Sequence, residues 1–253
     1  MKKYALFLLI AIFLAIALGP LIVWARGEVR FDADWRTADR RSTGIAPAAA
    51  RTPEAVVQVY AARAFNWRGL FGIHTWIATK PAGASSYTVH QVIGWQLPST
   101  GTALDSRRDL PDRRWYDASP WLLKDLRGPA AAALIPAIEA AVARYPYGDR
   151  YVLWPGPNSN SFVAWVAREV PALRLSLPVT AIGKDWLGDD RLLAKAPSGT
   201  GWQVSFGGYF GLLAAWHEGL ELNLGGAVLG VDLRHPALKL PGVGRVGVRA
   251  PLL

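Results

Sequence analysis

Cysteine is absent from the 253-residue sequence, which excludes disulfide bonds, thiolate metal sites and a cysteine nucleophile. Histidine is scarce, with four residues, and a metal site at His74 and His90 would need further ligands that the sequence does not place. We therefore predict no metal and no cofactor. Lysine and arginine form no dense run despite a net charge of +9, so we predict no nucleic-acid partner.

Apolar and aromatic residues are abundant. Hydrophobic residues make up 51% of the chain and charged residues 19%, a composition that favours a packed core over disorder. Twelve tryptophans suit a rigid core or a surface near a membrane interface. The basic excess gives a weak bias toward anionic lipid or a cell-wall polymer.

The N-terminus carries a long apolar run. Lys2 and Lys3 precede residues 4–25, which contain no charged residue. That length is enough to cross a bilayer core of about 30 Å at about 1.5 Å per residue. A cleaved signal peptide is the alternative, but the apolar run is unusually long for one and no clear A-x-A cleavage site precedes Arg26. We predict a retained single-pass signal anchor over residues 1–26 in the inner membrane, with the remaining chain in the periplasm.

The remaining chain is predicted to form one α+β domain over residues 52–253, after a juxtamembrane linker at 27–51. A capping residue followed by proline and an acid, Thr52-Pro53-Glu54, predicts a helix over 52–64. Between residues 97 and 182, the patterns predict a loop-rich region at 97–127, a sheet-packing helix at 129–144 and an extended segment at 173–182. Turns are predicted at 183–186 and 196–201. The rest of the chain is predicted to contain a core or interfacial segment at 206–216, a one-sided strand at 220–224 and a Pro/Gly-punctuated C-terminal tail.

Two strand-like segments, 71–79 and 86–95, predict a β-hairpin around a turn at residues 80–85. If Gly83 lies near the tip, His74 falls opposite His90, and their even spacing places both side chains on one face of the sheet. Trp76 would share the face of His74.

The rest of the chain is organised around residues 145–169. Tyr151-Val152-Leu153-Trp154 has the composition of a strand, and Pro155-Gly156-Pro157 ends it. Asn158, Ser159, Asn160 and Ser161 are residues that cap helices, and the apolar residues that follow have helical spacing. Free N–H groups and the positive end of the helix dipole favour a nucleophile or an anion there, although a polar cap without further role is the alternative.

A nucleophile site can be assembled from these residues, with Ser159 as nucleophile, His74 as base and His90 as the group that orients His74. Asn158, Asn160, Trp76 and Lys184 are the candidate ligand-binding residues. For Lys184, a salt bridge with its neighbour Asp185 is favoured over anion binding. The separation of 85 positions between His74 and Ser159 does not by itself bring them together.

The stretch Asn158-Ser159-Asn160-Ser161-Phe162-Val163 resembles the Asn-Cys-x-His-Phe-Val motif of circularly permuted papain-like hydrolases, the relatives of lecithin–retinol acyltransferase. The resemblance implies a papain-like domain with an antiparallel sheet packed on helices. It maps the catalytic cysteine onto Ser159, the histidine onto His74 and the second polar residue onto His90. Serine replaces the cysteine, so a thiolate mechanism does not carry over.

Over nearly its full length the sequence also resembles a bacterial membrane-anchored family, domain of unknown function 3750. The likeness lies in five stretches: His74-Thr75-Trp76, Tyr145-Pro146-Tyr147, Trp154-Pro155-Gly156-Pro157-Asn158-Ser159-Asn160, Ala181-Ile182-Gly183-Lys184-Asp185 and Pro197-Ser198-Gly199-Thr200-Gly201. These identify a family and assign no activity.

Two functions follow. The favoured one is a non-catalytic or degenerate papain-like protein of the cell envelope that binds the lipid bilayer and an unidentified envelope ligand or protein. The alternative is a hydrolase or acyltransferase that uses Ser159 and His74 on peptide, cell-wall or lipid acyl or amide bonds.

Overall fold

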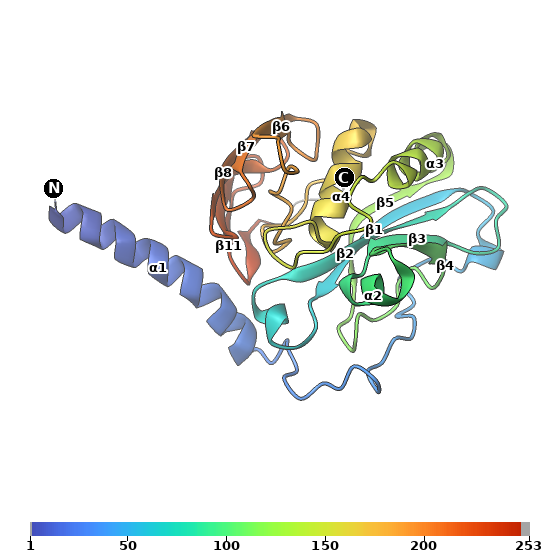
Figure 1. Ribbon diagram of the computed structural model, residues 1–253, viewed down its shortest axis with the longest axis horizontal. Helices are drawn as coiled ribbons and strands as arrows, with labels where there is room; N and C mark the ends of the chain where they lie inside the picture. Colours follow the sequence, from blue (N-terminus) through green and yellow to red (C-terminus); the bar gives the residue numbers. More distant parts are fainter. Residues whose placement is uncertain (1, 249–253) are drawn as a thin grey trace.

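The computed structural model describes residues 2–248, which form an α+β protein with two antiparallel sheets and four α-helices (Figure 1). The predicted α+β class is confirmed. The helices are α1 (Lys2–Ala25), α2 (Leu97–Thr100), α3 (Gly128–Ala143) and α4 (Ser159–Glu169). Short 3-10 turns lie at Ala49–Arg51, Asn66–Leu70, Gly94–Gln96 and Pro171–Leu173. The predicted helices at 129–144 and after Asn158 are confirmed.

The first sheet has the strand order β4-β3-β2-β1-β5. Its strands are β1 (Val56–Arg63), β2 (Ile73–Lys80), β3 (Thr88–Val92), β4 (Leu104–Arg108) and β5 (Trp121–Arg127). Helices α3 and α4 pack on one face and enclose the larger core (Figure 1). The predicted linker 27–51 contributes to the cover of the other face, where the Tyr87 hydroxyl donates to the carbonyl of Pro47 at 2.9 Å.

Strand β1 occupies the segment predicted to be a helix, so that prediction is wrong. The helix-start signal at Thr52-Pro53-Glu54 is present, but the next residues include the β-branched Val56, Val57 and Val59. All three are fully buried, with Val57 and Val59 under the helices and Val56 on the opposite face. A central strand covered on both faces gains more from these side chains than a helix with one buried stripe would.

Strands β2 and β3 form the predicted hairpin, but with a different register. Ile77 pairs with His90, so that position 74 lies level with position 93 instead of position 90. Residues that pair across two antiparallel strands point to the same face, so His90 shares a face with Ile77. His74 is three residues from Ile77, an odd number, and therefore points to the opposite face. The prediction that the two histidines are neighbours is wrong.

The second sheet is a seven-stranded meander. Its strands are β6 (Leu193–Lys195), β7 (Gly201–Phe206), β8 (Phe210–Ala215), β9 (Gly219–Leu224), β10 (Ala227–Asp232), β11 (Ala237–Leu240) and β12 (Gly244–Gly247). For this region the sequence predicts a turn at 196–201, a core or interfacial segment at 206–216, a strand at 220–224 and a Pro/Gly-punctuated tail. The strand at 220–224 is confirmed, whereas the predicted tail is wrong. Pro236, Pro241 and Gly242 fall in the turns between short strands, where they do not interrupt pairing.

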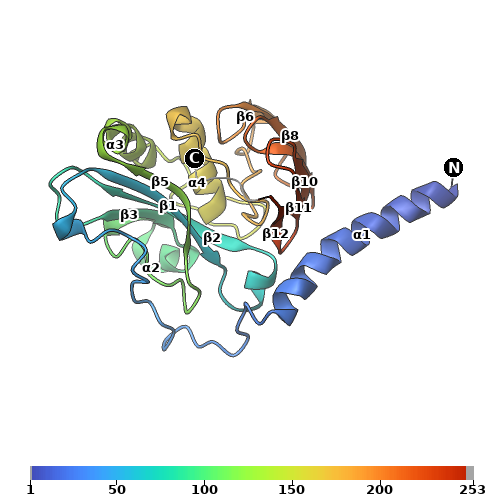
Figure 2. The ribbon, with the colours of Figure 1, turned by 180° about the vertical axis from the view of Figure 1, so that it is seen from behind.

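Helix α1 projects from the body beside the second sheet (Figures 1 and 2). Its last turns are packed, since Gly19, Pro20 and Val23 are buried and Gly19 lies against the carbonyl of Pro241. Within residues 2–248, no helix combines the length and hydropathy that a membrane crossing needs. Residues 1–26 were predicted to span a bilayer, and that is not supported. The part of α1 before Gly19, residues 2–18, is about 25 Å long at about 1.5 Å per residue, against about 30 Å for a bilayer core.

Candidate functional site

The segment before α4 is not the predicted strand. Residues 151–157 are irregular, and the only regular feature is a hydrogen bond from the Val152 N–H to the Pro157 carbonyl at 2.8 Å. Proline at 155 and 157 removes two backbone donors that a paired strand would use. Leu153 and Trp154 are therefore half-exposed instead of buried in a sheet.

The N-terminus of α4 is closed by a reciprocal cap. The Asn158 side-chain oxygen accepts from the backbone N–H groups of Asn160 and Ser161, at 2.9 and 3.0 Å. The Ser161 hydroxyl in turn accepts from the Asn158 N–H at 2.7 Å. The predicted capping role is confirmed, and a cap of this kind contributes about 1 kcal/mol.

Two buried amides at this cap also tie three segments together. The Asn160 side-chain NH₂ donates to the carbonyls of Ile73 in β2 and Ile182, at 2.9 and 2.8 Å. The Asn158 side-chain NH₂ donates to the carbonyls of Leu153 and Ile182, at 2.9 and 3.2 Å. Both side chains are buried, so the predicted ligand-binding amides are occupied by backbone groups.

Thr75, not His74, is the β2 residue that faces α4. Its hydroxyl donates to the Asn160 side-chain oxygen at 3.0 Å and approaches the Ser159 carbonyl at 3.4 Å. Neighbouring residues of a strand point to opposite faces, so His74 points away from Ser159. The structure therefore does not bring the predicted nucleophile and base together.

His74 lies in an aromatic cluster on the far face of the first sheet. Its ring stacks on Trp115 with a centroid separation of 3.5 Å, and its Nε2 hydrogen-bonds the Gln91 side-chain oxygen at 3.1 Å. Burial lowers the pKa of His74 to about 3, against the smaller opposing effect of Gln91. Trp76 on the same face is buried, and its indole N–H donates to the Pro111 carbonyl at 2.7 Å.

His90 lies on the α4 side of the sheet but does not orient His74. Its two ring nitrogens hydrogen-bond Thr79 and Ser106, at 3.1 and 2.7 Å. Burial lowers the pKa of His90 to about 4. Both histidines are consequently neutral near pH 7, and each is held by partners other than Ser159.

Lys184 is buried between two carboxylates. Its ammonium group lies 2.7 Å from Asp185 and 2.7 Å from Glu221 of β9, so the predicted pair with Asp185 is confirmed. Burial lowers the pKa of Lys184, but the two carboxylates outweigh it and hold the pKa above its ordinary value. Glu221 was not predicted, although its place between Leu220 and Leu222 marks a position that alternates with apolar ones.

Further buried groups extend this pair into a network that joins α4 to the second sheet. Glu221 also accepts from Lys239 of β11 at 2.6 Å. Arg168 of α4 donates to the Gln203 side-chain oxygen at 2.7 Å, and Gln203 in turn donates to Asp185. The network explains why the turn at 183–186 is polar and buried, because its charges face partners on the second sheet.

These contacts define an α+β protein in which the polar N-terminus of a central helix joins neighbouring segments. The chain belongs to the family described as "Protein of unknown function (DUF3750)", whose model matches residues 54–186. The match covers the first sheet, α3, α4 and the Lys184–Asp185 turn. No curated protein and no solved structure matches the chain, so the papain-like likeness stays a prediction.

Proposed function

We propose that the protein is a non-catalytic, membrane-associated protein of the cell envelope, in which the family domain is a rigid scaffold. The observation that carries this proposal is the placement of His74 and Ser159 on opposite sides of strand β2. A serine hydroxyl needs a base within hydrogen-bond reach to act as a nucleophile. The hydrogen bonds of both buried histidines go to other side chains.

The likeness of residues 158–163 to the papain-like motif supports the proposal that the domain descends from a papain-like hydrolase. In such a descendant, the positions that formed the catalytic centre of the hydrolase would instead stabilise the fold. Asn158 and Asn160 secure the helix N-terminus, and Thr75 closes the space between strand and helix. The envelope ligand or protein partner then binds elsewhere on the surface.

Helix α1 supports the membrane association. Large apolar side chains along its free part are exposed, namely Tyr4, Leu6, Phe7, Ile10, Phe13, Leu14 and Leu18. Lys3 lies at the end of this apolar part, and its charge suits the headgroup region. We propose that α1 inserts these side chains into the inner membrane and holds the domain on the periplasmic side.

Labelling with a fluorophosphonate probe tests the absence of catalysis. The purified full chain should remain unlabelled because no base activates Ser159, and a known serine hydrolase labelled in parallel serves as the positive control. Covalent labelling that disappears in Ser159→Ala would overturn the proposal and support the hydrolase alternative.

Flotation with lipid vesicles tests the membrane association. The full chain should rise with the vesicles, whereas a smaller fraction of a variant with Phe7→Ser, Phe13→Ser and Leu14→Ser should do so. The matched control replaces the exposed Ala132, Ala133 and Ala137 of α3 with serine and should float like the native chain. Equal flotation of both variants would rule out α1 as the attachment.

A further inference from the structure

The second sheet has the reverse of the usual alternation. In β7, Trp202, Val204 and Phe206 point outward and are 51%, 38% and 58% exposed, whereas Gln203 and Ser205 between them are 2% and 0% exposed. Strand β9 repeats the pattern, with Leu220 and Leu222 outside and Glu221 and Asn223 inside. A sheet with one solvated face ordinarily presents polar residues to water and apolar residues to the core.

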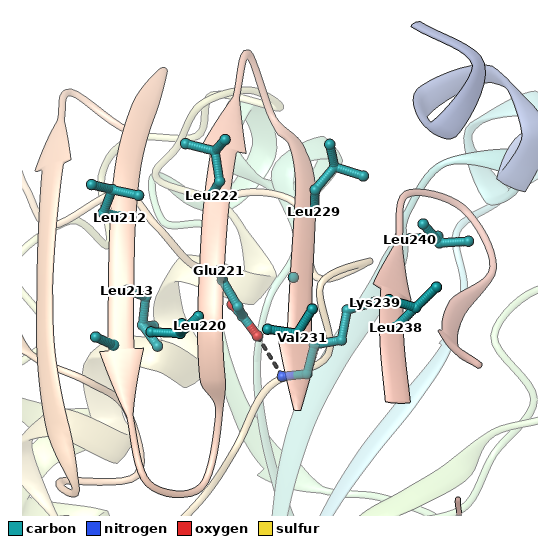
Figure 3. A pocket seen from close by; sticks show the side chains of 12 residues that line it. Leu212, Leu213, Leu220, Glu221, Leu222, Leu229, Val231, Leu238, Lys239 and Leu240 are labelled. Carbon is teal, nitrogen blue, oxygen red and sulfur yellow. Dashed lines mark hydrogen bonds and ion pairs between the residues drawn. The ribbon is translucent and has the colours of Figure 1, made fainter. Parts of the chain in front are cut away.

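The outward residues form one continuous apolar surface, which we call the outer face. It includes Trp202, Val204, Phe206, Phe210, Leu212, Leu220, Leu222, Leu238 and Val246, all of them exposed. A shallow groove of about 520 Å³ runs over β8 to β11, lined mainly by leucine and valine side chains (Figure 3). Apolar patches of this extent on a protein surface mark a binding surface.

The ion network fixes which face is turned outward. Lys184 and Lys239 hold Glu221 from the inside, and Arg168 holds Gln203. A one-residue shift in the register of β9 would turn Glu221 to the apolar outer face and leave Lys184 and Lys239 buried without it. The apolar outer face is therefore a built feature of this sheet.

Charge and position indicate a lipid surface as the occupant. All three acidic residues between positions 191 and 248, Glu218, Glu221 and Asp232, are buried. The exposed Lys195 pairs across the strands with Trp202 and therefore lies on the outer face. Lys195 lies over the Trp202 ring at 3.8 Å, which pairs a cation with an aromatic group as at a membrane interface.

Helix α1 provides the second argument for lipid. It packs on Pro241, directly after β11, and the second sheet lies on the side of the body from which α1 projects (Figures 1 and 2). A protein partner fitted to the outer face would leave the apolar side chains of α1 in water. A single lipid bilayer would cover both the apolar side chains of α1 and the outer face of the second sheet.

We propose that the outer face of the second sheet is a lipid-binding surface that lies on an anionic bilayer beside α1. This inference rests on the proposed membrane association and adds a second contact to it. The helix and the sheet together would fix the orientation of the domain on the membrane, which a single helix leaves free to rotate.

A single-cysteine label tests the inference, because the native chain contains no cysteine. Leu222→Cys places an NBD fluorophore on the outer face, and the exposed Ala137→Cys on α3 is the matched control. The labelled full chain is added to vesicles rich in phosphatidylglycerol. We expect the emission at position 222 to shift to the blue and its reduction by dithionite to slow several-fold, with neither change at position 137.

The outcomes separate the two proposals. If the chain floats with vesicles but both labels are reduced at equal rates, the lipid-binding sheet is wrong and attachment by α1 stands. If the chain does not float, both proposals fail. If position 222 is protected without vesicles and light scattering shows a dimer, the outer face is covered by a second copy, which overturns the lipid assignment.

Discussion

At the scale of single residues, the neighbours Asn160 and Ser159 differ in how much their side chains contribute to the stability of the fold. The Asn160 side chain makes three buried hydrogen bonds to Ile73, Ile182 and Thr75. No contact of comparable kind is formed by the Ser159 hydroxyl within residues 2–248. The polar cluster that attracted a catalytic interpretation is thus a structural joint centred on its asparagines.

We expect Asn160→Ala to lower the free energy of unfolding by about 2–4 kcal/mol, because two carbonyls and a hydroxyl lose their partner in a buried site. Ser159→Ala should change it by less than about 0.5 kcal/mol. Urea denaturation of the two variants and the native chain measures both values. A larger loss for Ser159→Ala than for Asn160→Ala would contradict the structural role of the cluster.

The buried histidines make stability depend on pH. The pKa of His74 falls from 6.5 to about 3 in the folded chain, so the unfolded chain binds more protons between these values. Stability should therefore decrease as the pH falls from 6.5 toward 3, by at most about 1.4 kcal/mol per pH unit for each such histidine.

His74→Phe keeps an aromatic ring against Trp115 and removes the titrating group. The unfolding free energy of this variant should fall less steeply between pH 6.5 and pH 4 than that of the native chain. Denaturant titrations at several pH values provide the slopes. Identical slopes would mean that His74 takes up its proton in the folded chain.

At the scale of elements, the second sheet is held to α4 by buried charges. Glu221→Gln should lower the unfolding free energy by about 3–5 kcal/mol, because Lys184 and Lys239 then face each other with less compensation. The exposed pair of Arg150 and Asp189 is the matched control, and Asp189→Asn should cost no more than about 1 kcal/mol. Similar losses in the two variants would show that burial adds nothing to the network.

At the scale of the whole molecule, the two sheets are expected to unfold together. The network from Arg168 through Gln203 and Asp185 to Glu221 crosses from α4 to β7 and β9. If α4 or the second sheet unfolded alone, the charged groups of the other part would stay buried without partners. Hydrogen–deuterium exchange in moderate denaturant should show β2 and β9 losing protection in one step. Loss of protection in β9 alone would mean that the second sheet is a separate folding unit.

Local signals in the sequence were sufficient for several features. Asn158 and Ser161 predict the cap of α4, because capping depends only on residues within one turn. The apolar spacing of α3 and the turn residues at 80–85 likewise act over short distances and give a helix and a hairpin. The Lys184–Asp185 pair joins adjacent residues and was found for the same reason.

Other features depended on packing between distant segments. Burial on both faces made residues 56–63 a strand in spite of a helix-start signal. A one-residue difference in register sent His74 to the face opposite His90, and no local pattern measures register that finely. The sequence by itself determined the alternation of Glu221 with its leucines. Only the tertiary structure decided that the glutamate faces inward, because its partners Lys184 and Lys239 come from segments that folding brings together.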